Sequence, residues 1–595
     1  MSTKESPSRY LCHPLLQFSE GQGWKDAPPE LIKDLLQISV EESLHLPGLF
    51  TLVVHNSYLP GREQDRPWRH EEFFKIGNKL KLGFAASTTE ADVFNEEAKE
   101  YLIEGEITAI EVHFNNKSEA PIIVRGYDTS HRLHRGRHNR SFLNETDSDI
   151  VHKIAAEVGI KVGQIDKSGE PHDYVFQENQ TNMEFLRERA ARIGFELFIQ
   201  LNKQTQVNEL HFHKPKAENP LALKWLRDIT SFTTRVTSAE QVSAVEVRGW
   251  DYGQKKLISS TAHAEKLVTE TGNGKGSSTS TEFDLRNKPP KMTVVDQPVF
   301  KTKEAEKMAQ ALCDELGGEF IYADAKTEGN PNIRPGRIIT LKSGPEGMGD
   351  RYGGEYYVTE TRHFYSQRVY TTDFSVRGLR GGSLLTTLSP QVHLKPGQTL
   401  LVGIVTDNKD PKGWGRVKVK LPTLTEEHSS NWARVVGLGA ANDRGFYCLP
   451  EVNDEVLVGF EHGDIHRPYV IGGVWNGLDA PPEDVDDTIQ KGKVRLRTVK
   501  TPTGHTLQFV EEDKGGSKAG VYIETAGGHK LYINDSDGFV EIETNGGHQL
   551  KMNDRSLPPE ISVSSKGNMS LKAQGNLEIK ANGTITVNGA MIYLN

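Results

Sequence analysis

Residues 560–587 read EISVSSKGNMSLKAQGNLEIKANGTITV, and this stretch repeats every eight residues. Each unit has two apolar residues with one polar residue between them, which is the period of a strand with one buried face. A glycine ends each unit and supplies a turn that a residue with a Cβ would resist. Two inward residues per unit cannot build a core, so the stretch needs copies of itself. The predicted core positions are Met569, Leu571, Leu577, Ile579, Ile585 and Val587, and the turn glycines are Gly567, Gly575 and Gly583.

A longer repeat precedes these octads. Residues 521–535 read VYIETAGGHKLYIND and residues 540–554 read VEIETNGGHQLKMND, nineteen residues further on, with identity at ten of fifteen positions. A weaker copy, GHTL, occupies residues 504–507. We therefore predict one continuous repeat region over residues 490–595.

Each copy of the longer repeat carries a histidine after its glycine, at His505, His529 and His548. In a trimer each position would form a ring of three imidazoles, which makes these residues metal-site candidates. The favoured alternative is that each histidine follows its turn glycine and hydrogen-bonds across the strand.

An assembly follows from the thin apolar stripe. A lone strand meander would expose its edges and bury little surface. A one-chain solenoid would need more repeats, larger inward residues and end caps. Three chains wound together remove both difficulties, so the repeats predict a trimeric rod whose stacked strands resist compression.

The whole chain has 595 residues, which is enough for about three to five domains. Its net charge of −10 provides no overall basic footprint for nucleic acid. The three cysteines stand far apart and form no metal or disulfide framework. No stretch approaches the ~20 apolar residues of a membrane span, and the N-terminus lacks the apolar run of a signal peptide.

The rest of the chain divides by composition. Strand-like segments predict a β-barrel over residues 1–140 and another over residues 230–389, with an α/β module over residues 141–229 between them. The module's helices are expected to begin at Thr146 or Asp147 and at Thr181 or Asn182, and a third helix has Thr302 as its N-cap.

Residues 126–144, which we call the basic segment, are the most basic part of the chain. Its arginines, Arg132, Arg135, Arg137 and Arg140, suggest nucleic-acid binding, but no aromatic ladder accompanies them. We favour a solvated or inter-subunit loop whose arginines pair with carboxylates. His211 and His213 share one face of a strand, but two histidines lack the further ligands of a zinc site.

Residues 395–480 hold about five short strands and no helix, the pattern of a small closed OB-fold barrel. Such barrels often bind nucleic acid. This one lacks the basic groove and stacking aromatics that would support such binding, so we expect no nucleic-acid partner.

The barrel segment also carries a family resemblance. It contains GRVKVKLP at 415–422, WARV at 432–435, LPEVNDEVLVGFEHGD at 449–464 and IGGVWN at 471–476. Upstream are HRLHRGRHNRSF and NQTNMEFLRERAARIGFEL. These motifs resemble VgrG proteins, the trimeric spikes of type VI secretion and related contractile injection systems, and the likeness extends over nearly the whole chain.

The resemblance implies a mainly β homotrimer in which the first 389 residues form a hub of two barrels. Residues 395–480 form a collar, and residues 490–595 form a β-prism needle. It implies inner-tube and baseplate partners at the hub, mechanical contact with a target membrane, and no cofactor or enzymatic activity. Because the last octad runs to the end of the sequence, we expect a blunt tip that takes a PAAR-like cap, with Tyr593, Leu594 and Asn595 as the tip interface.

The phrase NQTNMEFLRERAARIGFEL is closer to the spikes of extracellular, phage-tail-like injection particles than to typical type VI forms. We therefore expect assembly in the bacterial cytoplasm within a particle that is then released. A spike-borne cell-wall hydrolase and a glycan-binding adhesin that uses the OB barrel are the alternative functions.

Overall fold

The computed structural model places strands in 42% and helices in 14% of the chain, which confirms the prediction of a mainly β protein. The chain forms two compact units, Met1–Val474 and Trp475–Asn595. The described residues are 11–593 apart from 22, 59–67, 88–97, 115–119, 174, 218–219, 252–253, 267, 284–288, 296, 298 and 379–397.

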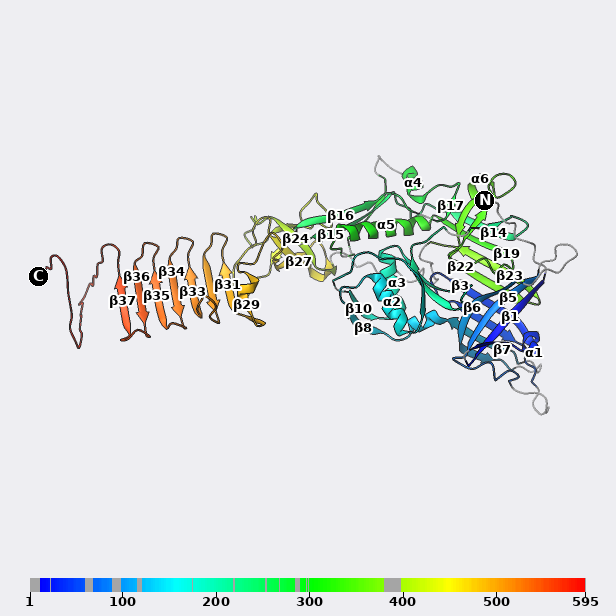
Figure 1. Ribbon diagram of the computed structural model, residues 1–595. Helices are drawn as coiled ribbons and strands as arrows, with labels where there is room; N and C mark the ends of the chain where they lie inside the picture. Colours follow the sequence, from blue (N-terminus) through cyan, green and yellow to red (C-terminus); the bar gives the residue numbers. More distant parts are fainter. Residues whose placement is uncertain are drawn as a thin grey trace. The chain divides into compact units, whose positions relative to one another are not determined.

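The largest element of the first unit is an eleven-stranded sheet that runs through both predicted β-rich regions (Figure 1). Strand β22 pairs antiparallel with β3 over seven residues, from Glu360 opposite Ser43 to Ser366 opposite Gln37. This pairing joins strands that lie more than 300 residues apart in sequence. In sheet order the strands are β14 (Ile229–Val236), β19 (Ile321–Glu328), β23 (Val369–Val376), β22 (Glu360–Ser366), β3 (Leu35–Ser43), β4 (Leu49–Val54), β7 (Ile122–Asp128), β6 (Ala98–Val112), β5 (Lys79–Ser87), β1 (Leu11–Glu20) and β2 (Gly23–Asp26).

Alternate residues along the strands of this sheet point into the core. In β4 every second residue is buried, and the ring of Phe50 packs in the core of the first region with Leu52 and Val54. The short helix α1 (Pro29–Asp34) places Leu31 in the same core. A second core lies beneath β19 and β23, around Phe320 and Phe374.

The two helices expected between residues 141 and 229 are present. Helices α2 (Asp147–Glu157) and α3 (Asn182–Arg192) begin at capping boxes, with Thr146 and Thr181 as the N-caps. Each threonine side chain accepts a hydrogen bond from the third helical residue, which satisfies a free backbone N–H. The other elements are η1 (Thr129–His134), β8 (His138–Phe142), β9 (Lys161–Ile165), β10 (Val175–Gln180), β11 (Glu196–Leu201) and β12 (Asn208–His213).

Helix α5 (Thr302–Gly318) confirms the third predicted helix, but Thr302 is its first helical residue and not its N-cap. Lys301 takes the extended cap position, and its side chain makes no cap hydrogen bond. The helix packs on the small sheet of β15 (Ala244–Asp251), β16 (Lys256–Ala262) and β18 (Lys291–Val294). Beside these lie β13 (Leu221–Leu223), β17 (Glu270–Thr271), β20 (Ile338–Leu341), β21 (Gly354–Tyr357), α4 (Gly276–Ser280), η2 (Thr281–Phe283) and α6 (Gly349–Tyr352).

The predicted five-stranded barrel is present. Its ladder order is β25–β24–β27–β28–β26, and a bridge between Val417 and Ala433 closes the ends. Buried valines fill the interior, as a small closed barrel requires. The strands are β24 (Leu401–Asp407), β25 (Lys418–Lys420), β26 (Arg434–Val435), β27 (Glu455–Phe460) and β28 (Pro468–Gly473), with η4 (Glu461–Gly463) after β27.

Polar contacts hold the barrel against the preceding sheet. The Trp250 indole N–H donates to Glu455 at 3.0 Å, and Arg248 donates to the carbonyl of Leu424 at 3.2 Å. Within the barrel, Asp410 accepts from Arg416 and from the backbone N–H of Lys412 at the start of its first loop. The Arg416 guanidinium holds the pKa of Asp410 well below its usual range.

The second unit is a meander of seven antiparallel five-residue strands, each paired with the next (Figure 1). Each nineteen-residue repeat is one hairpin and its connecting turn. The strands are β31 (Leu496–Lys500), β32 (Thr506–Val510), β33 (Gly520–Glu524), β34 (Lys530–Asn534), β35 (Phe539–Glu543), β36 (Gln549–Asn553) and β37 (Glu560–Ser564), preceded by α8 (Val485–Thr488), β29 (Ile489–Gln490) and β30 (Lys493–Val494). Among the described residues, no helix is both long enough and apolar enough to cross a membrane.

The hairpin turns explain the glycine of the nineteen-residue repeat. Gly528 has φ +82°, and a Cβ there would lie 3.3 Å from the Asn545 side chain. Gly528→Ala is therefore expected to destabilise the hairpin by about 1–2 kcal/mol. Hydrogen exchange of β33 and β34 measures the effect. Gly516→Ala is the control, because its φ is not left-handed and a Cβ meets nothing within 4 Å; equal protection in the two variants would contradict the turn argument.

Candidate assembly surface: the open apolar face of the repeat region

Register places the apolar residues of the meander on one face. Residues two apart on a strand share a face, and consecutive pairings align them into two rows across the sheet. We call these rows together the apolar face. One row is Val499, Leu507, Ile523, Leu531, Ile542, Leu550 and Val563, and the other is Phe509, Val521, Ile533, Val540, Met552 and Ile561.

Nothing in the described part of the chain covers this face. Ile542 is 46% exposed in the middle of the meander, and Ile561 is 72% exposed on its last strand. Scattered exposed apolar residues are ordinary on protein surfaces, but a continuous two-row patch marks an interaction site. The apolar face is therefore the candidate functional surface of this unit.

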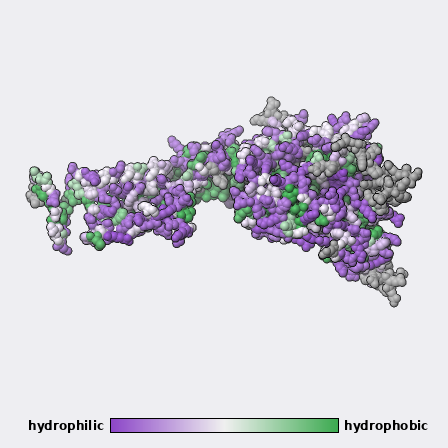
Figure 2. All heavy atoms as spheres, in the orientation of Figure 1, coloured by the Kyte–Doolittle hydropathy of each residue, from purple (hydrophilic) through white to green (hydrophobic). Residues whose placement is uncertain are grey.

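The opposite face is mainly polar, although Tyr522, Tyr532 and Phe539 also lie on it. Residues such as Gln508, Glu541 and Lys551 alternate with the apolar positions along their strands, and Lys551 forms an ion pair with Glu541 at 3.3 Å. Figure 2 shows the repeat region from one side, where hydrophilic residues predominate and hydrophobic ones are isolated. A meander with one polar and one apolar face has the pattern of a sheet that buries one side against a partner.

The apolar face leads directly into the octads. Ile561 and Val563 on β37 stand eight residues before Met569 and Leu571, so β37 is the strand of the first octad. The octad core predicted from the sequence begins at Met569 and omits these two positions. The eight-residue spacing itself was the signal that identifies them.

The six predicted core residues of the later octads have no partner strand in this chain. No strand occurs between residues 565 and 593, and all six side chains are 51–72% exposed. In a single chain the expected strands are thus absent after β37, because no neighbouring backbone is available to complete their hydrogen bonds. Their role as a core stays a prediction about the assembled protein.

The turn glycines of the octads need a correction. Gly567, Gly575 and Gly583 lie at bends, but none has a left-handed φ. A Cβ at Gly575 or Gly583 would meet nothing within 4 Å in this chain. The expectation that a Cβ would be resisted is therefore wrong for the single chain, because neither backbone strain nor a close neighbour opposes it.

At the predicted tip, Tyr593 is 82% exposed and stands eight residues after Ile585. Leu594 and Asn595 lie outside the described residues. The tip interface therefore remains a prediction.

The three histidines of the repeat region lie at successive turns along one edge of the meander. Each Nδ1 accepts a hydrogen bond at 3.3 Å from a backbone N–H of the next hairpin turn or of the segment after β37. Neighbouring histidines are two strands apart, about 10 Å, too far for one metal ion within a chain. The donors are Ala526 for His505, Asn545 for His529 and Lys566 for His548.

Three of the four arginines in the basic segment are paired with carboxylates. Arg132 binds Glu106, while Arg137 and Arg140 pair with Glu184 and Glu157. The absence of an aromatic ladder favours such pairing with carboxylates over nucleic-acid binding, and the structure shows the pairing within the chain.

On strand β12, His211 stacks on Phe198 with ring centroids 5.2 Å apart, and burial lowers the pKa of His211 to about 4. Throughout the described ranges, no group of three or more His, Cys, Asp or Glu side chains is arranged to hold a metal ion.

Comparison with known proteins agrees with this architecture. A family model described as the Type VI secretion system/phage-baseplate injector OB domain matches residues 401–475, the barrel. A second model, described as the Alg8 N-terminal domain, matches residues 71–367.

Curated relatives cover most of the chain. The type VI secretion system spike protein VgrG3 of Vibrio cholerae is 24% identical over 65% of this chain and 38% of its own length. The actin cross-linking toxin VgrG1 of Vibrio cholerae is 28% identical over 68% of this chain and 37% of its own length. The chain thus spans less than two fifths of the length of these two relatives.

Solved structures with similar folds include the 43 kDa tail protein of prophage MuSo2 from Shewanella oneidensis, at 14% identity and TM-score 0.45, covering 62% of this chain and 99% of that protein. An E. coli component of the type VI secretion system matches at 17% identity and TM-score 0.38, covering 77% of this chain and 99% of that protein. Both TM-scores are below 0.5, so these structures add no weight to the assignment. The OB-domain match and the spike-protein relatives make the chain similar to VgrG spike proteins of contractile injection systems, and the repeat region agrees with this likeness.

Proposed function

We propose that the chain is one subunit of a homotrimeric spike that connects the inner tube of a contractile injection system to a membrane-puncturing needle. The observation that carries this proposal is the open apolar face. Three copies that turn this face toward a common axis bury thirteen apolar side chains each. The octads beyond β37 then find neighbouring strands in the other two chains.

Burial of the apolar face supplies a free energy of the size that assembly requires. Full burial of an aliphatic side chain contributes ~1.5–3 kcal/mol, and these residues are already about half buried in one chain. Assembly then gains on the order of 10 kcal/mol per chain. That gain compares with an association cost of about 4–15 kcal/mol. Octad burial adds to the favourable side.

Light scattering of the purified chain tests the proposal. We expect a mass three times the 66.3 kDa of one chain at micromolar concentration. A monomeric mass at that concentration would contradict the proposal of a trimeric spike.

The partners follow from the same reading. The hub over residues 1–389 receives inner-tube and baseplate proteins, and a PAAR-like protein caps the needle at Tyr593–Asn595. The needle contacts the target membrane mechanically when the sheath contracts, and an effector travels on the spike. Association of the named VgrG relatives with type VI secretion supports this assignment.

The proposed role is mechanical and includes no reaction, nucleic acid or cofactor. One relative is named as an actin cross-linking toxin, and a spike-borne cell-wall hydrolase is the enzymatic alternative. A muralytic assay on the purified chain separates the two, because a mechanical spike leaves cell-wall material intact.

The particle that carries the spike is proposed to assemble in the bacterial cytoplasm and to be released as an extracellular, phage-tail-like body. The sequence of helix α3 and its surroundings, NQTNMEFLRERAARIGFEL, supports this choice over a type VI apparatus. Negative-stain imaging of material from culture supernatant would show free contractile particles; their confinement to cells would favour the type VI form.

A further inference from the structure

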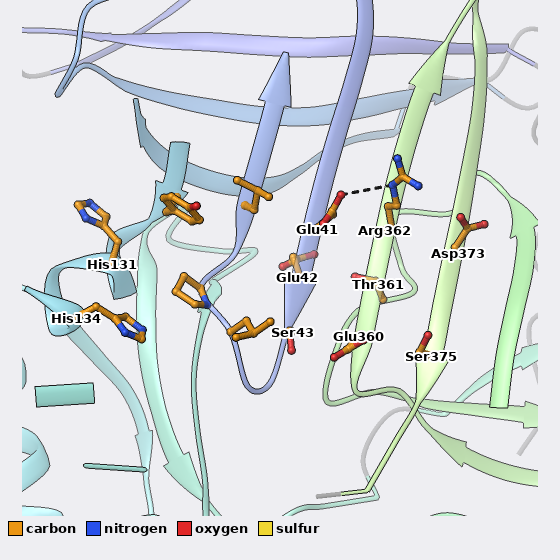
Figure 3. A pocket seen from close by; sticks show the side chains of 14 residues that line it. Glu41, Glu42, Ser43, His131, His134, Glu360, Thr361, Arg362, Asp373 and Ser375 are labelled. Carbon is orange, nitrogen blue, oxygen red and sulfur yellow. Dashed lines mark ion pairs between the residues drawn. The ribbon is translucent and has the colours of Figure 1, made fainter. Parts of the chain in front are cut away.

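A pocket of about 650 Å³ lies on the first unit where the two β-rich regions join. Its floor is formed by β3, β22 and β23, and η1 contributes His131 and His134 on the other side (Figure 3). The turn between β3 and β4 and the end of β7 complete the wall. The pocket is remote in sequence from the apolar face and shares no lining residue with it.

Strand register arranges the charges of the floor in rows. Arg362 on β22 stands between Glu41 on β3 and Asp373 on β23. Its Nε lies 3.5 Å from Glu41 Oε1, the ion pair drawn in Figure 3. The guanidinium also lies 4.9 Å from the centre of the Phe364 ring. The one arginine that lines the pocket is therefore held on the Glu41 side.

Two carboxylates of the floor have no partner among the described residues. Asp373 makes no ion pair, and its Oδ1 is buried without a hydrogen bond. Glu360 also makes no hydrogen bond or ion pair there, and burial raises its pKa although the nearby charge of Arg377 acts to lower it. The two residues are diagonal neighbours on adjacent strands, with Cβ atoms about 7 Å apart.

The remaining wall of the pocket is apolar. Leu46 is 51% exposed in the turn after β3, and Tyr127 is 37% exposed near the end of β7, with Leu49 beside them. An occupant that fits both walls has a positive, donor-rich group for the carboxylates and an apolar group for these side chains.

We propose that this pocket receives an arginine side chain, with an adjacent apolar residue, from a basic partner protein. A guanidinium presents five N–H donors in a plane, so it bridges Glu360 and Asp373, whereas a lysine ammonium is a single point charge. Charge complementarity favours a basic partner over a second copy, because this chain has net charge −10.

The chain's own basic segment is also a poor occupant. Arg132, Arg137 and Arg140 are engaged by carboxylates of the same chain. A second copy would have to break an ion pair to offer any of these three arginines. Arg135, which is exposed and makes no ion pair among the described residues, is covered by the comparison of dilute monomer with assembled protein below.

Two dipeptide probes test the proposal on the full chain by calorimetry and saturation-transfer NMR. The probes are acetyl-Leu-Arg amide and acetyl-Leu-citrulline amide, which have nearly the same shape and differ in charge. We expect the arginine peptide to bind at least tenfold more tightly. The double variant Glu360→Gln/Asp373→Asn is expected to remove this preference and leave residual apolar binding.

Glu346→Gln is the control, because Glu346 is an exposed carboxylate paired with Lys342 outside the pocket. It should bind both peptides like the unaltered chain. Equal affinity for the two peptides, no binding at all, or a preference that persists in the double variant would overturn the proposal. Binding by dilute monomer but not by assembled protein would place a second copy in the pocket and overturn the assignment to a basic partner. None of these outcomes alters the mass expected for the trimer.

Discussion

Replacing Ile542 and Leu550 by aspartate is expected to leave the protein monomeric under conditions where the unaltered chain is a trimer. The two residues are direct cross-strand neighbours on the apolar face. Three copies would place six carboxylates at one level of the axis. Lost apolar burial alone removes on the order of 10 kcal/mol per trimer, and each buried unpaired charge costs several kcal/mol more. Light scattering of the variant measures the mass.

The control for this variant carries the same number of new charges on the other face. Ser562→Asp/Ser564→Asp changes two residues of β37 that alternate with Ile561 and Val563. If the polar face points to solvent, this control stays trimeric. A trimer of the Ile542/Leu550 variant, or a monomer of the serine control, would mean that another surface holds the chains together.

Glu196 is expected to make the free energy of unfolding of the first unit depend on pH by about 3 kcal/mol. The Glu196→Gln variant is expected to lose this dependence. Glu196 is 5% exposed, accepts a hydrogen bond from the Tyr357 hydroxyl at 2.7 Å, and leaves Oε1 without a partner. Burial raises its pKa from 4.5 to about 7. A difference of about 2.5 pKa units corresponds to ~3 kcal/mol.

The sign follows from proton binding. Because the folded-state pKa of Glu196 lies above the unfolded value, the folded chain holds the extra proton. Its contribution to stability is fully present below about pH 4.5 and is lost as the pH rises through 7. The unaltered chain should therefore show stronger hydrogen-exchange protection of β11 and β12 at pH 5 than at pH 8, after correction for intrinsic exchange. The glutamine variant should show a smaller difference.

Glu209→Gln is the opposite-sign control on the neighbouring strand. Burial acts to raise the pKa of Glu209, but hydrogen bonds from Asn202 and Lys161 lower it overall. Its contribution is present above the unfolded pKa and is lost in acid. This variant should therefore weaken protection at pH 8, the reverse of Glu196→Gln. Parallel behaviour of the two variants would contradict the burial argument.

Local signals allowed the sequence to predict the elements that depend on near neighbours. Thr146 and Thr181 identify two helix starts because a cap bond spans only three residues. The nineteen-residue repeat predicts one continuous repeat region, and in the structure each of its strands pairs with the next. Thr302 was misassigned by one position, since the chain caps α5 at Lys301 without a side-chain bond.

Local sequence signals do not predict pairings between strands that lie far apart in the chain. No sequence feature near Glu360 indicates that β22 pairs with β3. The pocket between the two β-rich regions exists only because these strands pair. The unpartnered carboxylates of Glu360 and Asp373, and the raised pKa of Glu196, likewise depend on residues distant in sequence.

The octads of residues 560–587 show the same division. Sequence alone determined their eight-residue period and the two apolar positions of each unit, because side-chain alternation is a local property of extended backbone. The tertiary structure decided that the period begins at Ile561 on β37, that this strand pairs with β36, and that no later octad pairs within the described part of the chain. The physical reason is that a strand is completed by hydrogen bonds to a neighbour, and only the fold decides whether the same chain provides one.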